Sequence, residues 1–189
     1  MWKTSVTLLI PLFFGCASDL SERLEGQQAL FGDREVLSLT DEEGSTVARV
    51  DASSSDEWVH VALSLEDART AETLGDIPTE WDIAFQRFRI RVNGGASGSS
   101  GVEVATLVEE PFDELETAPS SGYGADEEDN DQDGDVESVF ETANDGWYVY
   151  DFSVHTLTPR PIVYVVKTHD EQFFKLEFLS YYDDAGSSG

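Results

Sequence analysis

The sequence predicts an all-β protein, built as a single antiparallel, β-sandwich-like domain of about eight to ten strands with long loops. Residues 58–65 alternate with the period of two that a strand shows, with one face made of Val59, Val61, Leu63 and Leu65 and the other of Trp58, His60, Ala62 and Ser64. Clusters of Gly, Asp, Ser and Asn separate the apolar runs, and residues 147–182 are rich in aromatic and β-branched residues. No repeat of roughly 20–50 residues occurs, which argues against a repeat architecture.

The expected strands follow one another from residue 35 onward. Two short apolar runs, at 36–39 and 46–50, flank the turn-prone Asp-Glu-Glu-Gly at 41–44. After the strand at 58–65, the segment 66–75 is expected to form a helical turn or an irregular loop. Further strands are expected at 81–92, 102–108, 147–152, 162–168 and 173–182, with Asp170 and Glu171 as a turn between the last two.

The longest expected strand, 81–92, changes the parity of its apolar residues halfway along. The apolar positions are Trp81, Ile83 and Phe85, followed by Phe88, Ile90 and Val92. One face of a uniform strand cannot hold both sets, because side chains alternate between the two faces. Either the strand is buried on different faces along its length, or a bulge near Gln86 and Arg87 resets the phase.

Two polar segments interrupt the second half of the domain. Residues 93–101 (NGGASGSSG) are rich in glycine and serine, as a flexible linker between domains would be. A strand pattern resumes directly afterwards without a change in composition, so we interpret this segment as a turn inserted within one domain. Residues 112–121 are expected to form a loop with a short strand, and an acidic run follows at 126–135.

The N-terminus has the order of a bacterial export signal. Lys3 supplies a positive charge, Val6–Phe14 supply an apolar run, and Gly15 precedes Cys16. The apolar run is too short to span a bilayer core of about 30 Å. A cysteine directly after a small residue is typical of lipoprotein processing, with Cys16 acylated. The alternatives are an ordinary secretory signal with a chance cysteine, or a buried core segment.

These features define the expected domain organisation. We expect a signal peptide at 1–15, a lipid-anchored flexible tether at 16–34, a β domain at 35–184 with an acidic loop at 124–137, and a disordered tail at 185–189. The expected location is the bacterial cell envelope, as an outer-membrane lipoprotein or a secreted protein. Contact with membrane is expected only through the N-terminal lipid anchor, which is stable when several acyl chains are attached.

Charge and cysteine content exclude several classes of function. The formal net charge is -28, with 11 Lys and Arg against 39 Asp and Glu. Nucleic acid is excluded as a partner, because binding phosphate backbones requires clustered cations. The single cysteine, Cys16, rules out a disulfide within the chain and any cysteine-built zinc or iron–sulfur site. Nucleophile, phosphate-loop and paired-histidine motifs are absent, so we expect no enzyme activity.

Three separated blocks of the sequence resemble the HmuY-like haem-binding lipoproteins in the same order. They are DASSSDEWVHVAL at 51–63, the segment 81–123 that begins WDIAFQRFRIRVNGG, and the segment 146–182 that begins GWYVY. The resemblance implies an all-β, lipid-anchored surface protein that binds haem for iron acquisition. Its expected partners are haem or another small ligand, with an outer-membrane receptor as a possible further partner.

The resemblance also directs attention to the residues that would hold haem iron. Gln86 stands where the family carries a ligating histidine, and the chain after Cys16 contains no methionine. The remaining candidates are His60, His155, His169 and Tyr123, since histidine and tyrosine can both ligate haem iron. Each histidine can equally be a packed or solvated residue of its strand or turn.

Arg87, Arg89 and Arg91 form a stripe on one face of the expected strand. In so acidic a protein these guanidinium groups could attract haem propionates or another anion. The alternative is cross-strand pairing with acids such as Glu103.

The acidic run matches the front half of a calcium-binding loop. Its carboxylates stand at alternate positions, Asp129, Asp131, Asp133 and Asp135, and Gly134 occupies the sixth position. The twelfth position is Phe140 instead of glutamate, and strands replace the usual flanking helices. A disordered acidic loop is the alternative. The sequence therefore favours a haem-binding surface lipoprotein with altered ligation, and the alternative is a non-haem binding or adhesion module, calcium-stabilised if the acidic run holds the ion.

Overall fold

Nearly all regular structure in the chain is β-strand, as the sequence predicts. The computed structural model describes residues 4–11, 38–42, 45–63, 68–70, 81–142 and 146–182. Within these residues the exceptions are a single 3-10 turn, η1 (Phe112–Glu114), and a single helical turn, α2 (Val139–Thr142). Every pair of neighbouring strands runs antiparallel, so the predicted fold class is confirmed.

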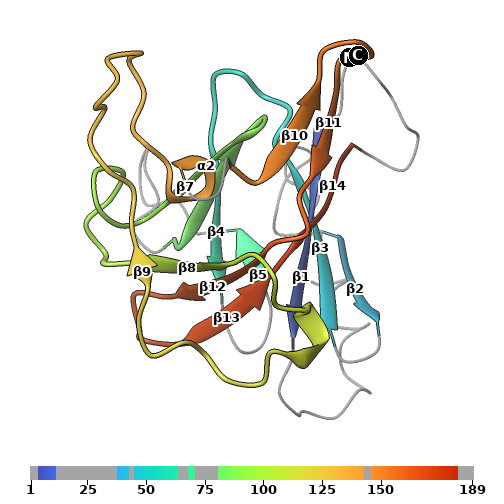
Figure 1. The fold of residues 1–189 in the computed structure, drawn as a ribbon, viewed down its shortest axis with the longest axis vertical. Coiled ribbons are helices and arrows are strands. Elements are labelled where there is room, and N and C mark those ends of the chain that lie inside the picture. The colour runs from blue at the N-terminus through green and yellow to red at the C-terminus, as the bar shows by residue number, and fades with distance from the viewer. Residues whose placement is uncertain are drawn as a thin grey trace.

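The described residues form three four-stranded sheets and one separate hairpin (Figure 1). The first sheet has the order β14-β1-β3-β2, with β14 at Phe178–Tyr182, β1 at Thr4–Pro11, β3 at Ser45–Asp51 and β2 at Ser38–Glu42. The second has the order β5-β4-β6-β7, with β5 at Ala68–Thr70, β4 at Val59–Leu63, β6 at Ile83–Gln86 and β7 at Arg89–Val92.

The third sheet also has four strands. Its order is β13-β12-β8-β9, with β13 at Phe173–Leu176, β12 at Val163–Lys167, β8 at Glu103–Leu107 and β9 at Tyr123–Gly124. The hairpin pairs β10 (Tyr148–Asp151) with β11 (Thr156–Pro159). It is joined to the first sheet by a hydrogen bond of 2.8 Å from the Leu157 amide to the Tyr182 hydroxyl.

The larger of the two hydrophobic clusters in the described residues receives side chains from all of these units. The two largest fully buried side chains are Trp147, just before β10, and Tyr164 of β12. Phe140 of α2 and Phe178 of β14 pack against Tyr164, with ring centroids 4.9 and 5.5 Å away. The core therefore lies between the sheets, as the sandwich-like prediction requires.

The parity change in residues 81–92 arises from a hairpin, and neither of the two expected explanations is correct. The chain reverses at Arg87 and Phe88, so that Gln86 pairs with Arg89. Arg87 has a φ of 56°, the left-handed conformation that two-residue hairpin turns require. Phe85 pairs with Ile90, and cross-strand partners share a face of the sheet. Ile83 and Phe85 before the turn therefore enter the same core as Ile90 and Val92 after it. Trp81 packs instead in a small separate cluster with Ala62 and Ala84, and Phe88 is exposed.

A similar correction applies near residue 170. The expected two-residue turn at Asp170 and Glu171 is a longer loop, closed by a hydrogen bond of 2.9 Å from the Thr168 amide to the Gln172 carbonyl. Glu171 adopts a φ of 62° there, so a non-glycine residue occupies the position that glycine would favour. The expected strand at 173–182 is also divided, into β13 and β14.

The glycine-rich segment 93–101 is a turn between β7 and β8. Backbone atoms of neighbouring segments lie very close to its glycines. A Cβ atom on Gly94 would lie 2.0 Å from the Val102 carbonyl oxygen, and one on Gly95 would lie 1.9 Å from the Asp126 carbonyl oxygen. The Ala96 amide donates a hydrogen bond of 2.8 Å to the same Asp126 carbonyl. The glycines are therefore required for close backbone packing and do not form a linker.

The segment 1–15, for which the sequence predicts an export signal, contains β1. This strand pairs with β3 on one side and with β14 on the other. Cys16 and the expected tether at 16–34 lie outside the described residues, as does the expected tail at 185–189. Among the described helices, none is long and apolar enough to cross a membrane.

Candidate functional site

The turn between β6 and β7 is the structural centre of the candidate site. The Arg87 amide donates a hydrogen bond of 2.6 Å to the Ala52 carbonyl, and the Trp147 indole nitrogen donates one of 3.0 Å to the Phe88 carbonyl. Both bonds hold the backbone of the turn, while the side chains of Arg87 and Phe88 remain exposed. Gln86, at the position of the family histidine, is buried, with only 8% of its surface exposed.

Four aromatic side chains extend from this turn along β10, and we call them the aromatic face: Phe88, Tyr148, Tyr150 and Phe152. The rings of Phe88 and Tyr148 lie 6.1 Å apart, and those of Tyr150 and Phe152 lie 4.9 Å apart. Tyr148 and Tyr150 share one face of β10 because they are two residues apart. Phe152 is 81% exposed and Tyr150 is 39% exposed, so apolar surface is left uncovered here.

His155 lies at the end of the aromatic face, in the turn of the β10–β11 hairpin. Its Nδ1 atom is 2.9 Å from the Tyr150 hydroxyl, and its backbone has a φ of 55°. The side chain is exposed, and Nε2 forms no hydrogen bond with any described residue. A hydrogen bond at Nδ1 with Nε2 open is the arrangement that metal-ligating histidines use.

The other two histidines occupy different surroundings. His60 packs edge-on against Trp81, with ring centroids 4.9 Å apart, and burial lowers its pKa while a hydrogen bond to the Trp58 backbone opposes the shift. His169 places Nδ1 3.1 Å from the Oδ1 atom of Asp82, whose side chain is completely buried. His60 and His169 therefore contact two consecutive residues, Trp81 and Asp82, whereas His155 contacts Tyr150 in the β10–β11 hairpin.

Tyr123 is also an unfavourable candidate for an iron ligand. Its ring lies 5.9 Å from that of Phe173, and its hydroxyl is buried without a hydrogen-bond partner among the described residues. Burial, followed by the negative charge of Glu103, raises the pKa of Tyr123. Since a tyrosine ligates iron as its phenolate, this environment disfavours the form that would bind.

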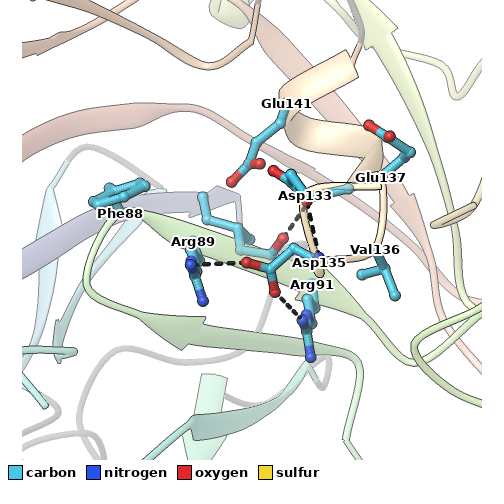
Figure 2. A pocket seen from close by; sticks show the side chains of 10 residues that line it. Phe88, Arg89, Arg91, Asp133, Asp135, Val136, Glu137 and Glu141 are labelled. Carbon is cyan, nitrogen blue, oxygen red and sulfur yellow. Dashed lines mark hydrogen bonds and ion pairs between the residues drawn. The ribbon is translucent and has the colours of Figure 1, made fainter. Parts of the chain in front are cut away.

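A pocket of about 260 Å³ adjoins the aromatic face at Phe88 (Figure 2). One wall is β7, which contributes Arg89 and Arg91. The opposite wall is the end of the acidic loop and α2, which contribute Asp133, Asp135, Glu137 and Glu141. Charged side chains from two distant parts of the sequence therefore meet across this pocket.

Asp135 binds both arginines of the pocket. Its carboxylate lies 2.7 Å from Arg89 and 2.9 Å from Arg91, and Arg91 also stacks 4.4 Å above the Trp58 ring. The alternative prediction, that these arginines form ion pairs with acidic residues, is therefore confirmed for Arg89 and Arg91. Their partner is Asp135 and not Glu103. That residue pairs across the sheet with Lys167, at 3.4 Å.

The acidic loop brings three carboxylates together. Oxygen atoms of Asp129, Asp131 and Glu137 all lie within 4.8 Å of one another. Asp133 is not in this group, and its Oδ1 atom accepts a hydrogen bond of 2.9 Å from the Asp135 amide. Sequence reasoning missed Glu137, although its ninth position in the calcium-loop numbering is a ligand position and was a usable signal.

Glu141 lies one place after the twelfth position of the calcium-loop pattern, and the sequence reasoning did not select it as a site residue. The Glu141 residue is exposed at the surface, yet the protein atoms around its carboxylate remove part of its hydration and raise its pKa to about 7. Arg89 opposes this shift, and the negative charges of Asp135 and Asp126 add to it. Tyr150 and Phe152 were missed for a different reason, since aromatic alternation in a strand ordinarily indicates sheet packing.

Comparison with known proteins identifies one family and several solved structures. A family model described as HmuY protein matches residues 54–189. A similar solved structure is the apo HmuY analog (TFO) of Tannerella forsythia, at 19% sequence identity, with 94% of this chain and 96% of that chain covered and a TM-score of 0.39. A search of curated proteins finds no match. The match to the family model over residues 54–189 therefore shows that the chain belongs to the HmuY protein family.

Proposed function

Because the chain belongs to the HmuY protein family, we propose that it is a binding protein for haem or a similar planar, largely apolar ligand. The observation that carries this proposal is the aromatic face, which leaves Tyr150 and Phe152 uncovered and ends at His155. Exposed apolar patches on a soluble domain are characteristic of ligand or partner binding. The combination suits a porphyrin, which needs apolar contact and an axial donor.

Apolar contact would supply much of the affinity. Covering an exposed phenylalanine contributes about 1.5–3 kcal/mol, and a porphyrin ring presents two flat apolar faces. Phe152 is 81% exposed, more than the other three residues of the aromatic face, so its ring would lose the most solvent-exposed apolar surface on such contact. Pre-existing ring pairs reduce the entropy lost on binding, because the side chains are already ordered against one another.

His155 is the iron ligand that this arrangement supports. Ligation through Nε2 requires Nδ1 to carry the proton and to donate it to the Tyr150 hydroxyl. The family histidine is replaced by Gln86, which is buried beside the turn, so the donor must come from another element. We propose Arg87 as the partner of a propionate, because it is exposed on the turn next to Phe88, whereas Arg89 is already paired with Asp135.

Haemin titration tests the proposal directly. We expect a shifted Soret band with the unmodified protein, and at least about tenfold weaker binding in His155→Ala, because an axial ligand is lost. Phe152→Ala should weaken binding while keeping the ligated spectrum. His60→Gln serves as the matched control, since that histidine packs against Trp81 away from the aromatic face, and it should bind normally. No Soret shift at micromolar haemin, or an unchanged His155→Ala variant, would refute the proposal.

The proposed location is the cell envelope, with the protein anchored through acylated Cys16. This part of the proposal rests on the order of Lys3, the apolar run and Gly15 in the sequence. Metabolic labelling with a fatty acid should mark the protein, and Cys16→Ser should abolish the label and release the protein from the membrane fraction. Labelling that persists in Cys16→Ser would contradict it.

A second candidate function is calcium binding by the acidic loop, on a non-haem binding module of the same scaffold. The observation that favours it is the convergence of Asp129, Asp131 and Glu137 within 4.8 Å. Calcium prefers several carboxylate oxygens in such an arrangement. Calcium should raise the melting temperature and a chelator should lower it, and Asp131→Asn should remove both effects. Indifference to both reagents would exclude this function.

A further inference from the structure

We infer that removal of residues 1–15 opens a strand-binding slot between β3 and β14, and that an extended segment of another polypeptide occupies this slot in the processed protein. The inference rests on the proposed processing before Cys16 and is independent of haem binding. It follows from the place of β1, which lies inside the first sheet, between β14 on one side and β3 on the other (Figure 1).

Backbone pairing on both sides of β1 defines the slot. β1 pairs with β3 from Ser45 to Asp51, and it pairs with β14 between Phe178 and Tyr182. Neighbouring strands lie about 4.7–4.9 Å apart, so β3 and β14 are two such spacings from one another and do not pair directly. Without β1, the amide and carbonyl groups that these two strands direct at it lose their partners, and such unpaired strand edges attract a further strand.

Both walls of the slot are held in place by contacts that do not involve β1. Phe178 of β14 packs against Trp147 and Tyr164, with ring centroids 4.9 and 5.5 Å away. The end of β3 is followed by Ala52, whose carbonyl accepts the hydrogen bond of 2.6 Å from the Arg87 amide. The slot should therefore keep its width when β1 is removed, because closing it would disrupt a closely packed core.

The two faces of the slot determine which side chains its occupant carries. On β3, Ala48 and Val50 are buried, whereas Arg49 between them is partly exposed. Cross-strand partners share a face of the sheet, so the occupant places alternate side chains beside Ala48 and Val50 in the core. The occupant is therefore an extended segment with apolar residues at every second position, and it runs antiparallel to both walls.

The supply of strands in the processed chain points to another polypeptide as the occupant. Residues 16–34, which follow the removed leader, are mostly polar and contain no valine or isoleucine. Each strand that the structure describes after β1 is already paired with a neighbour in the chain. A second processed copy has lost the same leader and cannot supply it. A partner that binds by strand addition gains affinity from main-chain hydrogen bonds and specificity from its alternate side chains.

Peptide binding to a chain that is cut between β1 and β2 tests the inference. A protease recognition sequence inserted between Cys16 and Arg34 allows the folded protein to be cut, which removes the covalent link to β1 as processing would. The probe is a fluorescent synthetic peptide of residues 3–12, which contains β1. We expect saturable binding when the cut protein is incubated with excess peptide. The uncut chain should not bind micromolar peptide, because its tethered β1 competes at an effective concentration on the order of millimolar.

Two substituted peptides separate strand addition from general adhesion. Leu8 pairs with Ala48 and Phe178, which are both buried, so Leu8→Asp in the peptide should weaken binding by at least about tenfold, because an unpaired charge would enter the core. Thr7 pairs with Arg49, which is partly exposed, so Thr7→Asp adds the same charge on the opposite face and should bind nearly as tightly as the unsubstituted peptide. Bound peptide should also slow amide hydrogen exchange in β3 and β14.

Three results would overturn the inference. The first is the absence of saturable peptide binding to the cut protein, as would follow if β3 and β14 closed on each other. The second is equal weakening by Leu8→Asp and Thr7→Asp, which would indicate charge repulsion alone. The third is equal binding to the cut and uncut chains, which would place the peptide outside the slot. Fatty-acid labelling tests the processing before Cys16 separately, so a failure of that proposal is distinguishable from a failure of the slot to bind a strand.

Discussion

Two acidic residues have unusual environments in this molecule, and the first of them, Asp82, stabilises the fold. Asp82 is completely buried between β4 and the loop before β13. Its Oδ2 atom accepts a hydrogen bond of 2.8 Å from the Leu63 amide, and its Oδ1 atom lies 3.1 Å from His169 Nδ1. A buried carboxylate with such partners connects two segments that are distant in the sequence.

Replacing Asp82 should therefore destabilise the fold. Asp82→Ala leaves the Leu63 amide buried without an acceptor, and the expected loss is about 3 kcal/mol in the free energy of unfolding. Urea denaturation measures this loss. Asp113→Ala, which removes an exposed carboxylate from η1, is the matched control and should change stability by less than about 0.5 kcal/mol. Equal effects of the two variants would contradict the structural role of Asp82.

The second unusual residue is Glu141, whose pKa in the folded state is about 7 against an ordinary value of 4.5. A raised carboxyl pKa means that the folded state binds the proton more tightly than the unfolded state does. The contribution of Glu141 to stability is therefore fully present below about pH 4.5 and is lost as the pH rises through about 7. Melting temperatures between pH 5 and pH 8 should fall with increasing pH, and Glu141→Gln should flatten the decline. An identical decline in both proteins would contradict this assignment.

At the scale of elements, the glycine-rich turn fixes how β7, β8 and the acidic loop meet. Gly95 has a φ of 59°, and its position leaves no room for a Cβ atom beside the Asp126 carbonyl. Gly95→Ala should therefore cost about 2 kcal/mol or more, since both backbone strain and steric overlap result. Gly101→Ala is the control, because Gly101 also has a positive φ of 76° but a Cβ atom added there would meet no described atom within 4 Å. Thermal denaturation should separate the two, and a larger effect at Gly101 would be inconsistent with the crowding.

The hairpin elements show where pattern reading from the sequence reaches its limit. Alternation located β4, β8 and β12 within one or two residues, because each is a half-buried or buried strand of ordinary length. The sequence pattern did not predict the chain reversal at Arg87 and Phe88, because neither residue is one of the usual turn residues. Packing of the turn against Ala52 and Trp147 stabilises a conformation that local propensity does not favour.

At the scale of the whole molecule, the net charge of -28 dominates the behaviour in solution. Mutual repulsion among the acidic groups opposes the compact state, and dissolved salt screens it over a Debye length of about 10 Å at 0.1 M. The melting temperature should therefore rise with sodium chloride concentration. Sodium chloride and choline chloride should have equal effects, since screening does not depend on the identity of the cation. A melting temperature that falls with salt would show that attractive pairs such as Arg89–Asp135 outweigh the repulsion.

The sequence by itself determined the fold class, the family resemblance and the acidic character, because periodicity, motif order and composition are properties of the linear chain. Only the tertiary structure decided which of the candidate side chains come together. It set His155 beside Tyr150 and Tyr123 beside Phe173, and it set His60 and His169 beside the consecutive residues Trp81 and Asp82. It also joined Arg89 and Arg91 to Asp135 and placed Glu141 across a pocket from β7. The contacts across the pocket join residues more than forty positions apart, and their pairing depends on strand register and turn geometry that no local pattern encodes.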